Sequence, residues 1–232
     1  MVSTRSSSVA LNTPDLPTPA KTPRSRKSAT PRAPTTTTTT TKTSAATWSH
    51  TPTPLTLLWL AVSVPLVAWD TGYVLLRPHT MEGGALHWPL YVPYKLYGEI
   101  DHIYGWKAFN AGNGFTSAQG TLNVVESLLY LAYLYLWSKG RASDGSVGGR
   151  VGGLGLLLGW AAAVMTLSKT VLYWLNEYYS GFDNIGHNTP FNLFFLWIIP
   201  NGAWIVLPTY MIYVMGADIL NAFAVASGDK SE

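Results

Sequence analysis

Four long apolar segments constrain the fold of this 232-residue chain more than any other feature. They lie at residues 54–76, 118–137, 151–175 and 191–214, and each is close to the roughly 20 residues that a helix needs to cross a bilayer. Only 12% of the residues are charged, against roughly 25% in soluble domains. Ten Trp and thirteen Tyr supply the amphipathic aromatic side chains that favour membrane interfaces. The sequence therefore predicts an all-α membrane protein, a bundle of four to five transmembrane helices.

The first 50 residues have a different composition. They are rich in Ser, Thr, Pro and Ala, contain a run of threonines, and carry seven basic residues against the single acidic residue Asp15. With almost no large apolar side chains, this stretch cannot bury enough surface to offset the entropy of ordering. We therefore expect a disordered basic tail at residues 1–50, a transmembrane domain at 51–222 and a short C-terminal tail at 223–232.

Basic residues also predict the orientation in the membrane. They are enriched in the N-terminal tail and in the loop 138–150, whereas the loop 176–190 contains no Lys or Arg. Because cytosolic loops carry an excess of Lys and Arg, we expect both termini and the loop 138–150 to face the cytosol.

Each span carries polar residues three or four positions apart, which places them on one face of a helix. The four sets are Asp70, Tyr73 and Arg77; Asn123, Glu126, Tyr130 and Tyr133; Lys169, Tyr173 and Asn176; and Asn201, Trp204 and Pro208. Ionisable groups in hydrocarbon normally face the bundle interior or a wet cavity. Four such stripes predict an internal ligand cavity, although polar side chains that only hold helices together would give the same pattern.

Glu126 is the strongest candidate for chemistry. Its own apolar segment contains no Lys or Arg, and a carboxylate without a partner in apolar surroundings takes up a proton readily and can act as an acid or base. Lys169 of the next span could instead pair with it, which would make both residues structural. The sequence leaves these two interpretations even.

The sequence contains no motif of a metal, cofactor or nucleophile site. The chain has no cysteine, its five histidines have no metal-ligand spacing, and it contains no phosphate-binding, dinucleotide-binding or nucleophile-elbow pattern. We therefore expect no cofactor, no metal and no nucleic-acid partner.

Several segments together resemble a known superfamily. VLYWLNEYYSGF (171–182) and PFNLFFLWIIPNGAWIVLP (190–208) are similar to the last two spans of the emopamil-binding proteins, which are sterol Δ8–Δ7 isomerases of the endoplasmic reticulum. AWDTGYVLLRP (68–78), GEIDHIYG (98–105) and SAQGTLNVVESLLY (117–130) resemble the wider EXPERA domain, which also includes the sigma-2 receptor. The resemblance covers residues 55–220.

The resemblance implies roles for individual residues. Glu126 and Asp70 occupy acidic positions of the second and first helices and would act as the catalytic acid and base. Ligand-binding roles fall on residues that match the family or lie on the polar stripes, namely Asp101, Asn123, Tyr130, Tyr173, Asn176, Asn201 and Trp204. In the isomerases a proton is added to a ring alkene and another is removed, through a carbocation that a carboxylate and an indole stabilise.

The sequence departs from the sterol isomerases in two places. Leu66 stands where those enzymes have a His one turn before the first-helix acid, and Lys169-Thr170 stand where they have a Gly-Asp pair.

Two functions follow from these residues. The first is an isomerase that acts on a sterol or a terpenoid-like polycyclic lipid in the endoplasmic reticulum. The second is a non-catalytic protein of the sigma-2 receptor type, which binds sterols or amphiphilic amines and takes part in lipid trafficking. A channel or transporter is less favoured because the chain has no inverted repeat. Assembly into a homodimer stays open.

Overall fold

A computed structural model describes residues 47–228 of the chain, so nearly all of the predicted N-terminal tail lies outside the described residues. The described part is mostly helical, which confirms the predicted fold class at that level. Its elements in chain order are β1 (Ser49–His50), α1 (Pro54–Leu75), the π-helical turn η1 (His87–Tyr91), α2 (Pro93–Ile100), α3 (Trp106–Asn110), α4 (Phe115–Gly140), β2 (Val147–Gly148), α5 (Gly149–Tyr179), α6 (Pro190–Asn192), the π-helical segment η2 (Leu193–Ile198) and α7 (Ile199–Ser227).

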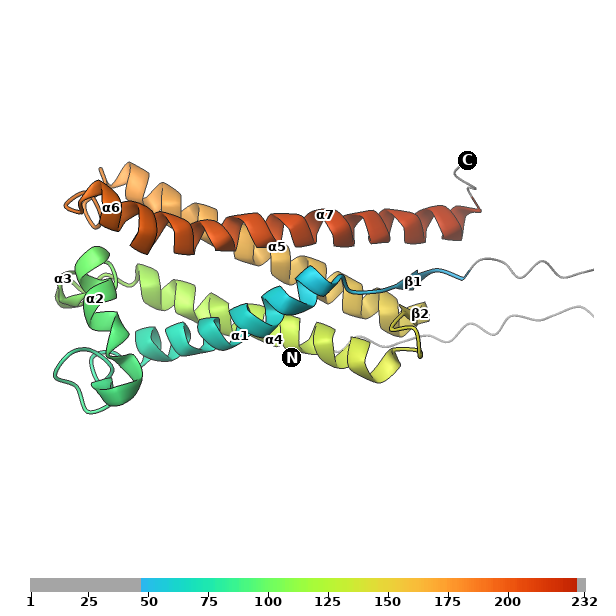
Figure 1. Cartoon of the computed structure of the whole chain (residues 1–232), viewed down its shortest axis with the longest axis horizontal. Helices are drawn as coiled ribbons and strands as arrows, with labels where there is room; N and C mark the ends of the chain where they lie inside the picture. The colour runs from blue at the N-terminus through green and yellow to red at the C-terminus, as the bar shows by residue number, and fades with distance from the viewer. Residues whose placement is uncertain (1–46, 229–232) are drawn as a thin grey trace, which may run out of the picture. The chain divides into compact units, whose positions relative to one another are not determined.

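The four long helices α1, α4, α5 and α7 pack side by side. Helix α4 contacts both α1 and α5, and α5 also packs along α7. The short helices α2, α3 and α6 lie together at one end of the bundle, here called the α2 end, and β1 and β2 lie at the opposite end, the strand end (Figure 1). The long connection between the first two spans therefore folds back onto the bundle instead of extending from it.

Three helical segments are long and apolar enough to cross a membrane, namely Pro54–Leu75, Gly149–Tyr179 and Pro190–Ser227. Helix α4 has 26 residues but is not among them. The described part of the chain thus has the composition of an integral membrane protein, with three of the four predicted spans recovered by length and hydropathy.

The helices extend beyond the predicted spans at most of their ends. The prediction that a loop begins at residue 176 is wrong, because α5 continues to Tyr179. Glu177, in this last part of α5, is 1% exposed. The predicted C-terminal tail begins within α7, which ends only where Gly228 adopts a left-handed conformation with φ of 73°. A glycine there is the usual stop signal of a helix.

The Pro200-Asn201 pair interrupts the last helical segment without breaking it. Proline has no N–H to donate, and the turn that precedes Pro200 is wound as the π-helix η2. The side-chain Nδ2 of Asn201 donates to the carbonyl oxygen of Trp197 at 2.9 Å. The amide therefore stabilises the irregular turn and remains on the inner side of the helix.

A glycine allows the helices to approach closely near the strand end. A Cβ atom at Gly159 of α5 would lie 3.0 Å from the ring of Tyr133 and 3.2 Å from Met215. Because both neighbours are fully buried, a larger residue at this position would push α5 away from α4 and α7.

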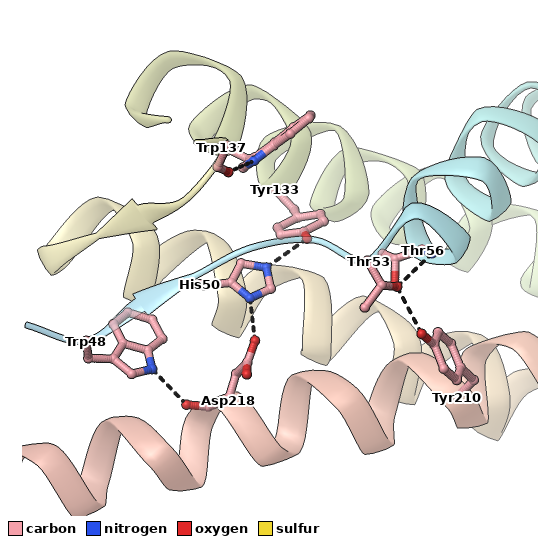
Figure 2. Close-up of polar contacts among 9 residues, drawn as sticks. Trp48, His50, Thr53, Thr56, Tyr133, Trp137, Tyr210 and Asp218 are labelled. Carbon is pink, nitrogen blue, oxygen red and sulfur yellow. Dashed lines mark hydrogen bonds and ion pairs between the residues drawn. The ribbon is translucent and has the colours of Figure 1, made fainter. Parts of the chain in front are cut away.

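The last residues of the predicted tail are in fact part of the bundle. Strand β1 pairs antiparallel with β2, and the side chain of His50 is buried beneath it. Nδ1 of His50 donates to Oδ2 of Asp218 at 2.7 Å, the hydroxyl of Tyr133 lies 2.9 Å from Nε2, and Nε1 of Trp48 donates to the carbonyl oxygen of Asp218 at 3.0 Å (Figure 2). The boundary of the tail therefore lies before Trp48 and not at residue 50.

Candidate functional site

A cavity of about 400 Å³ lies in the half of the bundle near the α2 end. Residues of α1, α2, α4, α5 and of the last helical segment line it. Most of its wall is apolar or aromatic, including Trp69, Tyr97 and Tyr104. Small-molecule sites of roughly 300–1,000 Å³ have this character, an apolar wall with a few placed polar groups.

Five of the nine predicted site residues line this cavity: Asp70, Asn123, Tyr173, Asn201 and Trp204. They come from four different helices, so the structure brings together the polar faces that the spacing predicted on each helix separately. Among the described residues that line the cavity, Asp70 is the only carboxylate.

The other four predicted residues lie elsewhere. Glu126 and Tyr130 are buried one and two turns beyond Asn123, away from the α2 end, and do not line the cavity. The hydroxyl of Tyr130 is bonded to that of Thr166 at 3.0 Å. Asn176 is also outside the cavity and donates to Oε1 of Glu177 at 3.3 Å. The fourth, Asp101, lies behind the wall.

Glu126 is paired with Lys169. Nζ of Lys169 lies 3.0 Å from Oε2 of Glu126, and the two side chains are 11% and 2% exposed. Of the two interpretations that the sequence left even, the geometry therefore gives the paired one. Removing either partner would leave an uncompensated buried charge, which is strongly destabilising.

A continuous polar chain crosses the cavity wall. The hydroxyl of Tyr94 donates to Oδ1 of Asp70 at 2.7 Å, and Nδ2 of Asn123 lies 3.4 Å from Oδ2 of the same carboxylate. The oxygen of the Asn123 amide in turn accepts from Nζ of Lys169. One amide therefore joins the carboxylate that faces the cavity to the Lys169–Glu126 pair.

Tyr94 keeps the proton with which it orients Asp70. Burial, and after it the charge of Asp70, raises the pKa of the Tyr94 hydroxyl far above its usual range. The hydroxyl is thus a permanent donor to Oδ1 of Asp70.

Asp101 supports the wall from behind. Its Oδ2 accepts from the hydroxyl of Tyr173 and, at 2.7 Å, from Nε1 of Trp197, and its Oδ1 accepts from the N–H of Ile103 at 3.1 Å. Burial raises the pKa of Asp101 to about 6, and these three hydrogen bonds oppose the rise. Through Tyr173, this carboxylate fixes one aromatic side of the cavity.

Trp204 is held by another indole. Its ring lies edge-on to that of Trp59, with centroids 4.9 Å apart and planes inclined by 71°. Edge-to-face packing of this kind fixes ring orientation, so the side of Trp204 that faces the cavity is set by the helix pair.

Several lining residues are not among the site residues predicted from the sequence. Tyr94, Tyr97 and Tyr104 come from the connection between the first two spans, and Gln119 and Lys169 come from the spans themselves. The density of tyrosines between residues 91 and 104 was the available signal, because amphipathic aromatic rings suit a wall that is apolar with polar edges.

Within residues 47–228, no group of three or more His, Asp or Glu side chains is arranged to hold a metal ion. No family model, curated protein or solved structure matches the chain.

Proposed function

We propose that this chain is an EXPERA-type membrane protein that binds a sterol-like or other polycyclic lipid in the cavity and shifts a double bond in it by proton transfer. The observation that carries the proposal is the cavity itself, with its aromatic wall and the single carboxylate of Asp70. The partner we propose is therefore a hydrophobic small molecule that enters from the bilayer.

The proposal includes α4 as a fourth span. Its outer face exposes Val125, Leu128 and Leu131 to 46%, 61% and 50%, while Asn123 and Glu126 point inward. The polar stripe lowers the mean hydropathy of the helix although its outward surface is apolar. With four spans and the basic loop at the strand end, both termini would face the cytosol, in a membrane such as that of the endoplasmic reticulum.

Asp70 is the residue we assign to proton transfer. Tyr94 fixes one of its oxygens, and the long 3.4 Å contact with Asn123 leaves the other weakly bonded. A positioned carboxylate beside the reacting carbon can remove a proton and return it elsewhere. Glu126 would contribute only through Lys169.

A second candidate function is binding without chemistry. It is favoured by the Lys169–Glu126 pair, which leaves one carboxylate on the cavity wall where the resemblance implies two. Asp70 would then serve as an acceptor or counter-ion for the polar group of a stored or transported lipid.

Lipid retention and deuterium uptake test the proposal together. The full chain, in lipid nanodiscs in D₂O, is incubated with a Δ8 sterol and with a steroid ketone whose double bond is not conjugated. We expect the wild type to retain at least one of them and to incorporate deuterium into it, and we expect Asp70→Asn to retain it without incorporation.

A matched pair of variants controls for the location. Leu196→Trp adds bulk to the cavity wall, whereas Leu220→Trp makes the same change on a side chain of α7 that is 68% exposed and does not line the cavity. Only the first should abolish retention. Retention of neither lipid by the wild type would refute the proposed function, and retention without deuterium uptake would leave the second candidate.

A further inference from the structure

Lys169 is a cation in the wall of a cavity otherwise suited to an apolar ligand. Its ammonium group has three N–H donors. Nζ forms an ion pair with Oε2 of Glu126 at 3.0 Å, and one N–H donates to the amide oxygen of Asn123. Lys169 has no further hydrogen-bond acceptor among residues 47–228, so one donor remains for a ligand in the cavity that the side chain lines.

A hydrogen-bond acceptor, the carboxylate of Asp70, lies on the same side of the cavity as Lys169. The side-chain oxygen of Asn123 accepts a hydrogen bond from Lys169, and its side-chain nitrogen lies 3.4 Å from Oδ2 of Asp70. The carboxylate and the ammonium are therefore separated by the width of one amide. A ligand next to Asn123 meets a base on one side and a positively charged hydrogen-bond donor on the other.

The sign of this charge selects among reaction intermediates. A carbocation beside an ammonium group is destabilised, whereas an oxyanion is stabilised by both the charge and the hydrogen bond. Glu126 balances the charge of Lys169, but it lies beyond the end of the cavity, whereas Lys169 lines the cavity wall. Of the two charges of this pair, only the ammonium borders a ligand at this point.

We propose, building on the proposed function, that the substrate is a polycyclic lipid ketone whose carbon–carbon double bond is one carbon removed from conjugation with its carbonyl. Asp70 removes a proton from the carbon between the two groups, so that a C–H bond breaks and an O–H bond forms on the carboxylate. The electron pair moves to the carbonyl oxygen, and Lys169 donates a hydrogen bond to this dienolate. Asp70 then returns the proton to the far carbon of the former double bond. The product is the conjugated ketone, with no net change in protons or electrons.

Conversion of a steroid 5-ene-3-ketone tests this assignment. The conversion is measured by the ultraviolet absorbance of the conjugated enone, with protein-free nanodiscs as the background. The matched substrate is a Δ8 sterol, which has a ring alkene and no carbonyl. We expect the wild-type chain to convert the ketone and to leave the Δ8 sterol unchanged. Asp70→Asn should remove the conversion.

The role of Lys169 needs a variant that keeps the buried charges balanced. Lys169→Met alone would leave Glu126 unpaired, so the variant of choice is Lys169→Met combined with Glu126→Gln. Loss of an oxyanion donor lowers kcat by about a hundredfold or more, and we expect a decrease of that order while the retention of the ketone is preserved. Lys169→Arg, which keeps a cationic donor, should recover part of the rate.

The outcomes separate this inference from the proposed function. Conversion of the Δ8 sterol without conversion of the ketone would overturn the inference and support the proposed function. Retention of the ketone without its conversion, or a double variant with wild-type kcat, would also overturn the inference. Retention of neither substrate would instead show that the proposed function itself is wrong.

Discussion

At the strand end of the bundle the polar side chains around His50 satisfy one another, whereas at the α2 end several buried polar side chains border a cavity. His50 has Asp218 of α7 on one ring nitrogen and Tyr133 of α4 on the other (Figure 2). Asp70 and Lys169 also have protein partners, but each keeps hydrogen-bonding capacity on the side of the cavity.

The difference lies in what closes each end. At the strand end, Gly159 lets α5 approach the ring of Tyr133, and the rings and methionines around it fill the space. At the α2 end, α2 covers the helix ends and leaves a cavity beneath it. Buried polar side chains thus stabilise the fold at the strand end, whereas at the α2 end they are available to a ligand. Substitutions at the two ends should affect different measurements.

The largest expected effect concerns Asp101 and its pH dependence. Its pKa is raised to about 6 in the folded chain, above the ordinary value of 3.8. Its contribution to stability is therefore fully present below about pH 4 and is lost as the pH rises through 6. We expect this loss to reach about 3 kcal/mol, measured as the difference in unfolding free energy between the wild type and Asp101→Asn from pH 4 to 7.

The control for this measurement is Asp144→Asn, at an exposed loop position. That variant should follow the wild-type pH curve in this range. If Asp101→Asn follows the same curve as well, Asp101 does not titrate there in the folded state, which would contradict the prediction.

A second prediction addresses the strand end. His50→Ala leaves the hydroxyl of the fully buried Tyr133 without its partner, and a lost buried hydrogen bond of this kind costs about 1–3 kcal/mol. We expect the unfolding free energy in detergent to fall by about 2 kcal/mol. Retention of the lipid at the α2 end should not change. A loss of retention at unchanged stability would contradict the proposed separation of the two ends.

Helical spacing predicted the cavity residues well where a single helix face was sufficient. Asp70, Asn123 and Asn201 face inward because residues three and four apart share a face in any regular helix. Spacing does not report depth along the bundle. It therefore predicts Glu126, which lies on the same face as Asn123, to line the cavity, although the cavity ends before it. The sequence predicts the pairing of Glu126 with Lys169 only as one of two alternatives.

Contacts between distant segments were beyond the reach of the sequence pattern. Tyr94 reaches Asp70 only because the connection after α1 folds back over the helix ends, and no local periodicity encodes that return. His50 and Tyr133 are 83 residues apart. The composition around Trp48 and His50 is that of a tail, yet three hydrogen bonds with the bundle order this segment.

The smallest expected effect comes from removing one hydroxyl at each end. Tyr133→Phe deletes the hydroxyl bonded to His50, and Tyr94→Phe deletes the hydroxyl that donates to Asp70 at 2.7 Å. Both changes conserve the ring, so packing differs little between them. We expect Tyr133→Phe to lower the unfolding free energy by about 1 kcal/mol and to leave the turnover of the lipid substrate unchanged. Tyr94→Phe should instead lower turnover by about tenfold, because the carboxylate loses the donor that orients it, with a smaller change in stability. If the two variants shift stability and turnover in the same proportions, the α2 end is packed for stability like the strand end, and the distinction between them does not hold.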